Sequence, residues 1–245
     1  MMRKLILGLM LLALPGLALA APAASYFMST TVDPHDKASL QRGANHFVNY
    51  CLSCHQAELM RYKRIADDLG IDEDLMMETL VRSPDAMIHD TMLNAMRVED
   101  AEQWFGAPPP DLSLYVRRHG PDRLFSFLNG YYRDDSQTWG VNNVVVAGVS
   151  MPHVLEILQG LPEPVFEENN GSMSVVGVRM NDASPGLLSE EEYLQFTRDL
   201  TNFLDYVAEP VKAERERMGA FVIAFLLIFF VVAYLLKREY WKDVH

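Results

Sequence analysis

Apolar residues recur at helical spacing in several parts of the chain and predict a mainly α-helical fold. One stripe runs through residues 39–50, which Ser39 is placed to cap, and it ends on Cys51. A methionine-rich pattern follows at residues 84–100, and a shorter one at residues 124–128 stops at Gly130. These patterns predict three helices, the first of which carries Cys51 on its buried face.

The C-terminal third of the chain predicts two longer helices separated by Pro210. Residues 189–207 open with Ser189 and Glu192, the spacing of a capping box, and continue with an apolar face. Residues 218–236 are a run of 19 without a charge. As a helix this run is about 29 Å long, close to the hydrocarbon thickness of a bilayer, so it predicts one membrane span.

Two segments lack helical periodicity and are predicted to be irregular or extended. Residues 106–113, Gly-Ala-Pro-Pro-Pro-Asp-Leu-Ser, cannot be helical because the prolines lack donors, and Asp111 is placed to cap the segment that follows. Residues 160–186 contain turn residues and a stretch at 171–178 that predicts a small hairpin.

The first 20 residues have the pattern of a secretory signal peptide. Arg3 and Lys4 precede an apolar run from Leu5 to Leu14, and Ala18-Leu19-Ala20 has the form of a cleavage site. We therefore expect a bacterial exported protein, with residues 21–217 in the periplasm, residues 218–236 in the inner membrane and residues 237–245 in the cytoplasm.

The chain is acidic, with a formal net charge of −12 that becomes −14 when Arg3 and Lys4 are removed. This charge argues against nucleic acid and favours basic partners. Acidic residues are dense at 67–78, which indicates either a solvated helix face or a docking patch for a basic electron-transfer partner. The exported part, about 197 residues, is of a size for one core and no second full domain.

Residues 51–55, Cys-Leu-Ser-Cys-His, carry the most specific chemical signal. Two thiols three apart followed by histidine form the attachment signature of a c-type haem, in which Cys51 and Cys54 bond the porphyrin and His55 ligates iron. The alternatives are a disulfide, half of a zinc site or coincidence. A zinc site needs further ligands, and the chain has no other cysteine.

A second axial ligand decides whether the iron is closed or open to small molecules. Methionine makes a high-potential electron carrier, and histidine a carrier of lower potential. Spacing does not choose among the methionines, but Met151, followed by Pro152, lies in irregular backbone that can present its sulfur. His153 is the rival candidate.

The motifs together resemble the cytochrome c1 family. The resemblance rests on residues 51–55, on Pro109 to Ser113 running on to Arg118-His119-Gly120, on Gly148 to Pro152, and on Ala208-Glu209-Pro210 followed by one membrane span. It implies one covalent haem c held by Cys51 and Cys54, iron ligated by His55 and Met151, and a haem propionate paired with Arg118. The implied fold is a mainly α, mono-haem cytochrome c-type domain with loop insertions and a C-terminal transmembrane helix.

The resemblance also implies the role and the partners. The expected protein is the haem subunit of the respiratory cytochrome bc1 complex, which passes electrons from the Rieske iron–sulfur protein to a c-type cytochrome, beside cytochrome b in the membrane. No bond-making catalytic site is expected on this chain alone. The alternatives are an anchored haem c carrier of another respiratory branch, such as an oxidase subunit, and an open-site haem enzyme or sensor.

Overall fold

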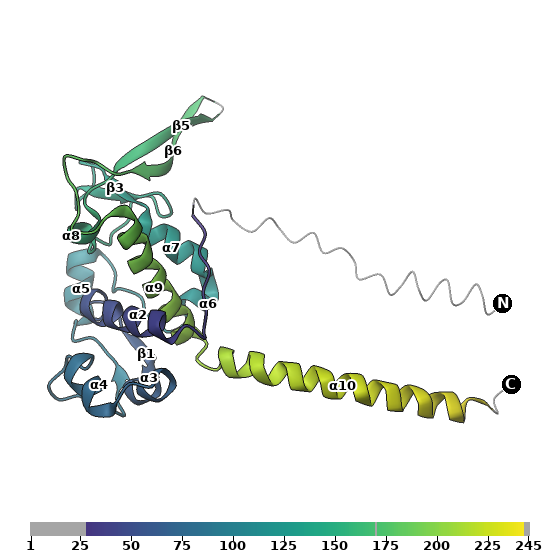
Figure 1. Cartoon of the computed structure of the whole chain (residues 1–245). Helices are drawn as coiled ribbons and strands as arrows, with labels where there is room; N and C mark the ends of the chain where they lie inside the picture. The colour runs from purple at the N-terminus through teal and green to yellow at the C-terminus, as the bar shows by residue number, and fades with distance from the viewer. Residues whose placement is uncertain (1–27, 170, 243–245) are drawn as a thin grey trace.

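The computed structural model describes residues 28–169 and 171–242, and the predicted signal peptide lies outside them. Most helices gather in one domain, from which helix α10 extends alone (Figure 1). The helices are α2 (Lys37–Tyr50), α3 (Tyr62–Leu69), α4 (Glu73–Thr79), α5 (Val98–Phe105), α6 (Tyr115–His119), α7 (Pro121–Asn129), α8 (Glu156–Gln159), α9 (Glu190–Ala208) and α10 (Lys212–Tyr240). The strands form three antiparallel pairs: β1 (Ala57–Arg61) with β2 (Thr91–Met92), β3 (Tyr131–Arg133) with β4 (Val141–Asn143), and β5 (Glu163–Asn169) with β6 (Ser172–Arg179).

Helices α2 and α9 form the centre of the core. The stripe predicted for residues 39–50 is buried, and the rings of Phe47 and Phe203 lie 5.8 Å apart between the two helices. Gly43 lies where α2 meets α9, and its missing side chain lets the α9 backbone approach closely. The two helices therefore fix the end of α2, which leads directly into Cys51.

The first turn of α2 differs from the prediction, because its N-cap is Asp36 and not Ser39. The Asp36 carboxylate accepts a hydrogen bond from the Ser39 amide at 3.0 Å. The Ser39 hydroxyl instead donates to Asp199 of α9 at 2.7 Å, and Arg42 donates to the same carboxylate at 2.6 and 3.0 Å. Asp199 is buried, and a buried carboxylate needs such partners, so these bonds tie α2 to α9.

The methionine-rich residues 84–100 do not form the predicted helix. The Met87 amide donates to the Asp90 side chain at 2.8 Å, and the Ile88 carbonyl accepts from the Lys63 amide at 2.7 Å. Strand β2 then pairs with β1 and buries Met92, and the next helix, α5, begins only at Val98. The apolar side chains of this segment pack from irregular backbone.

The hairpin predicted near residues 171–178 is confirmed. Strands β5 and β6 pair from Glu163 opposite Arg179 to Asn169 opposite Ser172, and the ribbon extends away from the domain (Figure 1). The predicted break at residues 106–113 is confirmed as well, because this segment contains no helix or strand.

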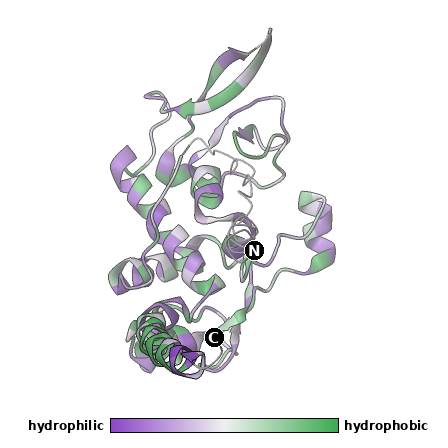
Figure 2. Cartoon of the chain, turned by 90° about the vertical axis from the view of Figure 1, so that its right-hand side faces the viewer, coloured by the Kyte–Doolittle hydropathy of each residue, from purple (hydrophilic) through white to green (hydrophobic). Residues whose placement is uncertain are grey.

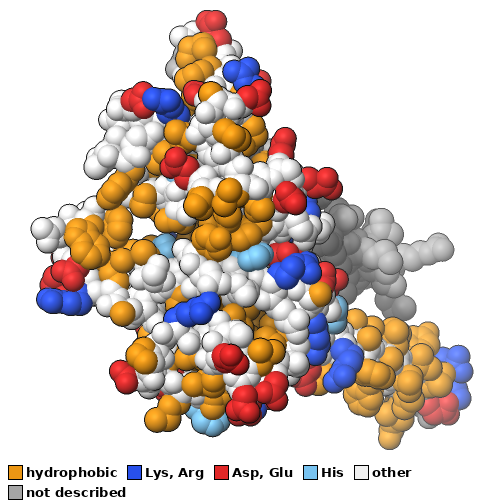
Figure 3. Space-filling model, turned by 60° about the vertical axis from the view of Figure 1, so that its left-hand side comes forward, with side chains coloured by type: hydrophobic (Ala, Val, Ile, Leu, Met, Phe, Trp, Pro, Cys, Tyr) orange, Lys and Arg blue, Asp and Glu red, His pale blue; other side chains and the backbone are white. Residues whose placement is uncertain are grey.

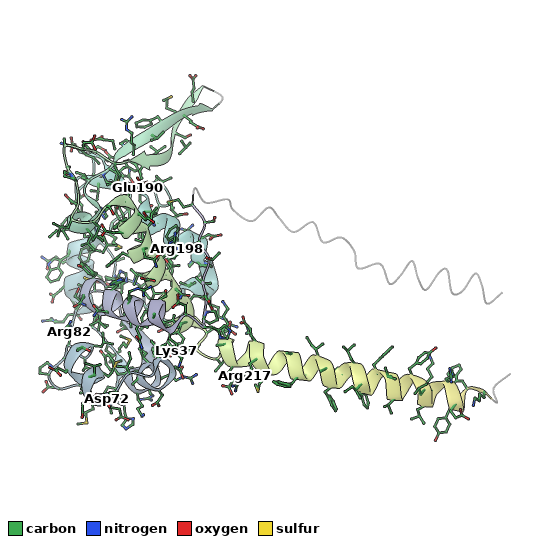
Figure 4. All side chains as sticks on the ribbon, viewed as in Figure 1. Lys37, Asp72, Arg82, Glu190, Arg198 and Arg217 are labelled. Carbon is green, nitrogen blue, oxygen red and sulfur yellow. The ribbon has the colours of Figure 1, made fainter. Side chains whose placement is uncertain are left out.

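Helix α9 starts with the predicted capping box of Ser189 and Glu192. After Pro210 the chain enters α10, 29 residues long, which contains the whole apolar run and is long and apolar enough to cross a membrane. Figure 2 shows hydrophobic colour over most of α10, and Figure 4 shows its side chains projecting away from the helix, with Arg217 near the domain. Among the described residues it is the one helix of this kind.

Candidate functional site

The two cysteines lie in a tight turn at the end of α2. The Cys51 amide still donates to the Phe47 carbonyl at 2.9 Å, and the amides of Cys54 and His55 then both donate to the Cys51 carbonyl, at 3.0 and 2.7 Å. This turn brings both thiols and the imidazole to one end of one helix. Both cysteines are free thiols, which argues against the disulfide alternative.

The side chains around the thiols also argue against zinc. Cys51 is buried, and burial raises the pKa of its thiol to about 12, so the thiol is neutral near pH 7. A structural zinc site needs four ligands. The described residues contain no group of three or more His, Cys, Asp or Glu side chains that could hold a metal ion. The donor set therefore fits a haem, whose vinyl groups bond neutral sulfur and whose iron takes the imidazole.

His55 is oriented by a contact with a distant part of the chain. Its Nδ1 donates a hydrogen bond to the Pro110 carbonyl at 2.8 Å, which leaves Nε2 as the nitrogen for a ligand. Burial lowers the pKa of His55 and so favours the neutral imidazole that ligates metals. In a histidine that ligates a metal, the other ring nitrogen usually donates a hydrogen bond to a group such as a backbone carbonyl.

The segment that carries Pro110 is fastened to strand β1. The Asp111 carboxylate accepts from the Glu58 amide at 2.9 Å and from the Ser113 amide at 2.8 Å, and the Ser113 hydroxyl accepts from the Leu59 amide at 3.1 Å. Asp111 therefore closes a turn and does not cap α6 as predicted, since that helix begins at Tyr115 after the uncapped Leu114. These bonds hold the Pro110 carbonyl against His55.

Asn94 is a residue of the site that the sequence did not indicate. Its side-chain amide donates to the Cys54 carbonyl at 2.5 Å, from the segment that was predicted to be helical. An asparagine outside any motif gives no sequence signal for such a contact.

Met151 lies in the loop between β4 and α8, beside a second, smaller apolar cluster. The buried members of this cluster are Tyr131, Val141 and Val149, and Met151 is half-buried against them. Phe127 of α7 packs against both this cluster and the main core that contains Cys51. Helix α7 therefore joins the part of the domain that carries His55 to the part that carries Met151.

His153, the rival candidate for the second axial ligand, is enclosed by the fold. Its ring is 7% exposed and stacks on Tyr131, with centroids 4.6 Å apart and an interplanar angle of 9°. Burial is the largest influence on this imidazole and lowers its pKa to about 4, although the Gly160 backbone and the Gln159 side chain act in the opposite direction. The stack on Tyr131 holds the ring inside the fold, and this enclosure favours Met151 over His153 as the ligand.

Arg118 lies on α6 with an exposed side chain. Its neighbours are already engaged: Arg117 is 3.4 Å from a carboxylate oxygen of Glu209, and the His119 ring packs on Tyr115 at 4.7 Å. Within the described ranges no carboxylate lies within salt-bridge distance of Arg118, so its guanidinium remains open to an anionic group.

Comparison with known proteins places this arrangement in a family. The model of the Cytochrome C1 family matches residues 26–244. The chain is 47% identical to cytochrome c1 of Allochromatium vinosum over the whole of both proteins. It is 42% identical to a protein of Nitrosomonas europaea named ammonia monooxygenase gamma subunit, over 87% of each chain. It is 25% identical to the mitochondrial cytochrome c1 haem protein of Saccharomyces cerevisiae, over 92% of this chain and 74% of that one.

Proposed function

The chain belongs to the cytochrome c1 family, whose members are haem-bearing electron-transfer subunits of the bc1 complex, and from this we propose that its electron passes through a haem c held at residues 51–55. Cys51 and Cys54 bond the two vinyl groups, and His55 ligates the iron through Nε2. The observation that carries the proposal is the hydrogen bond from His55 Nδ1 to the Pro110 carbonyl, which fixes the imidazole beside two free thiols.

When bound, haem c supplies an iron that alternates between the ferric and ferrous states and so carries one electron at a time. The protein residues hold and tune that group, and no substrate bond is made. Pro110 keeps His55 in one orientation and raises its basicity, while the apolar core around Cys51 excludes water.

Met151 is the second axial ligand in this proposal. A thioether ligand beside the imidazole ligand would raise the potential of a bound haem and would close its iron to small molecules, as an electron carrier requires. Two observations support the choice. Met151 and Phe127 pack against the same small cluster, and Phe127 also packs against the main core that contains Cys51. His153 is enclosed against Tyr131.

Arg118 pairs with a haem propionate. An ionised propionate that leaves water needs a cation, and arginine offers two parallel donors to a carboxylate. The Arg118 guanidinium is exposed on helix α6, which follows the segment that carries Pro110, and this position supports the role.

The protein is anchored in the membrane, and α10 is the anchor. We assign the haem domain to the periplasm because the pattern of residues 1–20 predicts a signal peptide, and we assign residues 237–245 to the cytoplasm. Within a bc1 complex, cytochrome b is the neighbour of α10, the Rieske iron–sulfur protein is the electron donor and a c-type cytochrome is the acceptor.

The negative charge of the chain favours a positively charged electron acceptor. The net charge of the chain is −12, and Figure 3 shows Asp and Glu side chains at several places on the face that it presents. Opposite charges steer association and raise its rate.

The proposal is tested in membranes of a bacterium that lacks its own copy of this chain. The full chain is expected to restore quinol-dependent reduction of a soluble c-type cytochrome, and Cys54→Ser is expected to abolish it. Met173→Leu, an exposed change on the β5–β6 hairpin, serves as the control with the wild-type rate. A Cys54→Ser membrane that reduces the cytochrome at the wild-type rate overturns the proposal.

A further inference from the structure

The loop that carries Met151 is held by the short ribbon of strands β3 and β4. Tyr131 pairs with Asn143 and Tyr132 with Asn142 across this ribbon. The side-chain oxygen of Asn142 accepts from the Gly148 amide at 2.8 Å, and that of Asn143 accepts from the Val145 amide at 2.9 Å. Both asparagines are buried, so the start of the loop is fixed by bonds shielded from water.

Tyr131 holds the end of the same loop by two separate contacts. Its hydroxyl donates to the Met151 carbonyl at 3.2 Å. Its ring stacks flat on His153, two residues further on, and meets the edge of Phe127 at 5.4 Å and 71°. Tyr131 is 1% exposed, so its ring has no freedom to follow a moving loop.

These contacts lie on the two sides of Pro152. The proline fixes its own φ, and the hydroxyl bond and the ring stack fix the residues before and after it. The loop is therefore held at three consecutive residues, Met151, Pro152 and His153. A side chain as flexible as methionine gains a defined direction only when its backbone is held in this way.

We propose that Tyr131 is a positioning residue for the axial ligand, and that its hydroxyl bond to Met151 together with its stack on His153 keeps the Met151 sulfur on the iron. This inference rests on the proposed function, in which Met151 is that ligand. Tyr131 acts through the backbone of the loop.

Competition with an external ligand measures how firmly the sulfur is held. Cyanide binds ferric haem only when the methionine leaves, so a looser loop raises the apparent affinity for cyanide. Tyr131→Phe removes the hydroxyl and keeps both ring contacts. We expect about fivefold tighter cyanide binding, the factor that a net hydrogen bond of about 1 kcal/mol supplies.

Tyr132→Phe is the matched control. Tyr132 is the next residue of β3 and is also buried, but successive side chains of a strand point to opposite faces. We expect it to bind cyanide with wild-type affinity. The measurement uses the full-length protein in detergent, together with the long-wavelength absorption band that ferric haem shows when sulfur is bound.

The outcomes separate this inference from the proposed ligand. Three results together support the inference. Wild-type protein shows the sulfur band. Tyr131→Phe shows a weaker band and binds cyanide more tightly, and Tyr132→Phe shows no change in either. A wild-type band that Tyr131→Phe leaves unaltered, with unaltered cyanide affinity, overturns the positioning role alone. Wild-type protein without a sulfur band overturns Met151 as the ligand, and the inference with it.

A second variant covers the case in which Tyr131→Phe does not assemble. His153→Leu removes the ring stack and leaves the hydroxyl bond to Met151 in place. It is expected to bind cyanide more tightly than wild type while keeping covalent haem. Wild-type affinity in this variant contradicts the inference.

Discussion

A methyl group added to Gly43 of α2 would lie 2.2 Å from the carbonyl oxygen of Asp199 in α9. It would also lie 2.6 Å from Cβ of Phe203, so backbone and side chain both occupy the space. The glycine therefore allows a close approach of the two helices. The end of α2, and with it Cys51, is positioned by this contact.

Gly43→Ala is therefore expected to destabilise the domain by about 1–3 kcal/mol, the usual cost of overpacking a filled core. Thermal unfolding of the full-length protein in detergent measures it. Gly177→Ala, on strand β6 with no atom near the added methyl, is the control and should unfold close to wild type. Equal unfolding temperatures for wild type and Gly43→Ala would show that α9 can move away at no cost.

Met151→Leu is expected to keep covalent haem but lower its potential. Leucine has a similar size and no sulfur, so the change removes the ligand without leaving a cavity. We expect a fall on the order of 100 mV, a fraction of the roughly 0.8 V range that axial ligands span. A redox titration checks this, with the exposed Met173→Leu as control. An unchanged potential and spectrum would exclude Met151 as the ligand.

His46 makes stability depend on pH. It packs on Phe196 with ring centroids 3.9 Å apart, and burial lowers its pKa in the folded state. The unfolded chain keeps the ordinary value near 6.5, so below that pH it binds more protons than the folded protein. The stability associated with His46 is thus fully present above about pH 6.5 and is lost as the pH falls through the lowered pKa.

His46→Phe keeps a ring against Phe196 and removes the titration. Unfolding between pH 7 and pH 5 is expected to show a smaller loss of stability in this variant than in wild type. His89→Phe, at an exposed position, is the control and should follow the wild-type curve. Identical curves for His46→Phe and wild type would contradict the assignment.

The acidic residues 67–78 are partly neutralised within the fold. Lys63 lies 2.5 Å from an oxygen of Asp67 and 2.8 Å from one of Glu73, and Arg64 lies 2.5 Å from one of Asp68. Asp72, Asp74 and Glu78 form no salt bridge with the described residues. Asp72 is the N-cap of α4 and accepts hydrogen bonds from the amides of Asp74 and Leu75, whereas the Asp74 and Glu78 carboxylates accept no such bonds from the described residues. If this region docks a basic cytochrome, these two carboxylates carry most of the attraction.

Replacing both residues, Asp74→Asn with Glu78→Gln, is therefore expected to flatten the dependence of cytochrome c reduction on ionic strength. Glu190→Gln with Glu191→Gln is the control with equal charge change, since Figure 4 shows Glu190 at the end of the domain opposite Asp72. A salt dependence that is unaltered in the first pair would remove docking from the roles of residues 67–78.

Much of the fold could be predicted because local patterns agree with tertiary packing. The stripe ending on Cys51, the capping box of Ser189 and the hairpin near Gly171 all have local causes, and the structure confirms each. The methionine-rich segment was mispredicted because its periodicity competes with local polar groups. The Asp90 and Asn94 side chains accept hydrogen bonds from nearby backbone amides, and such local bonds favour turns over a helix.

The candidate site was only partly predictable for a related reason. Residues 51–55 are a contiguous motif, and their chemistry can be read from residue types alone. The partner of His55 is a backbone carbonyl 55 positions further along the chain, and such a group has no side-chain signature. The contacts of Tyr131 with the Met151 loop likewise depend on the pairing of β3 with β4, which no local pattern specifies.

The most direct test of the account is whether haem stays on the denatured chain. Full-length protein from membranes is run on a denaturing gel and stained for the peroxidase activity of haem, with a Cys51→Ser, Cys54→Ser double variant beside it. The account predicts a stained band at the mass of the wild-type chain and none for the double variant. A wild-type chain without staining, or equal staining of both, would contradict it.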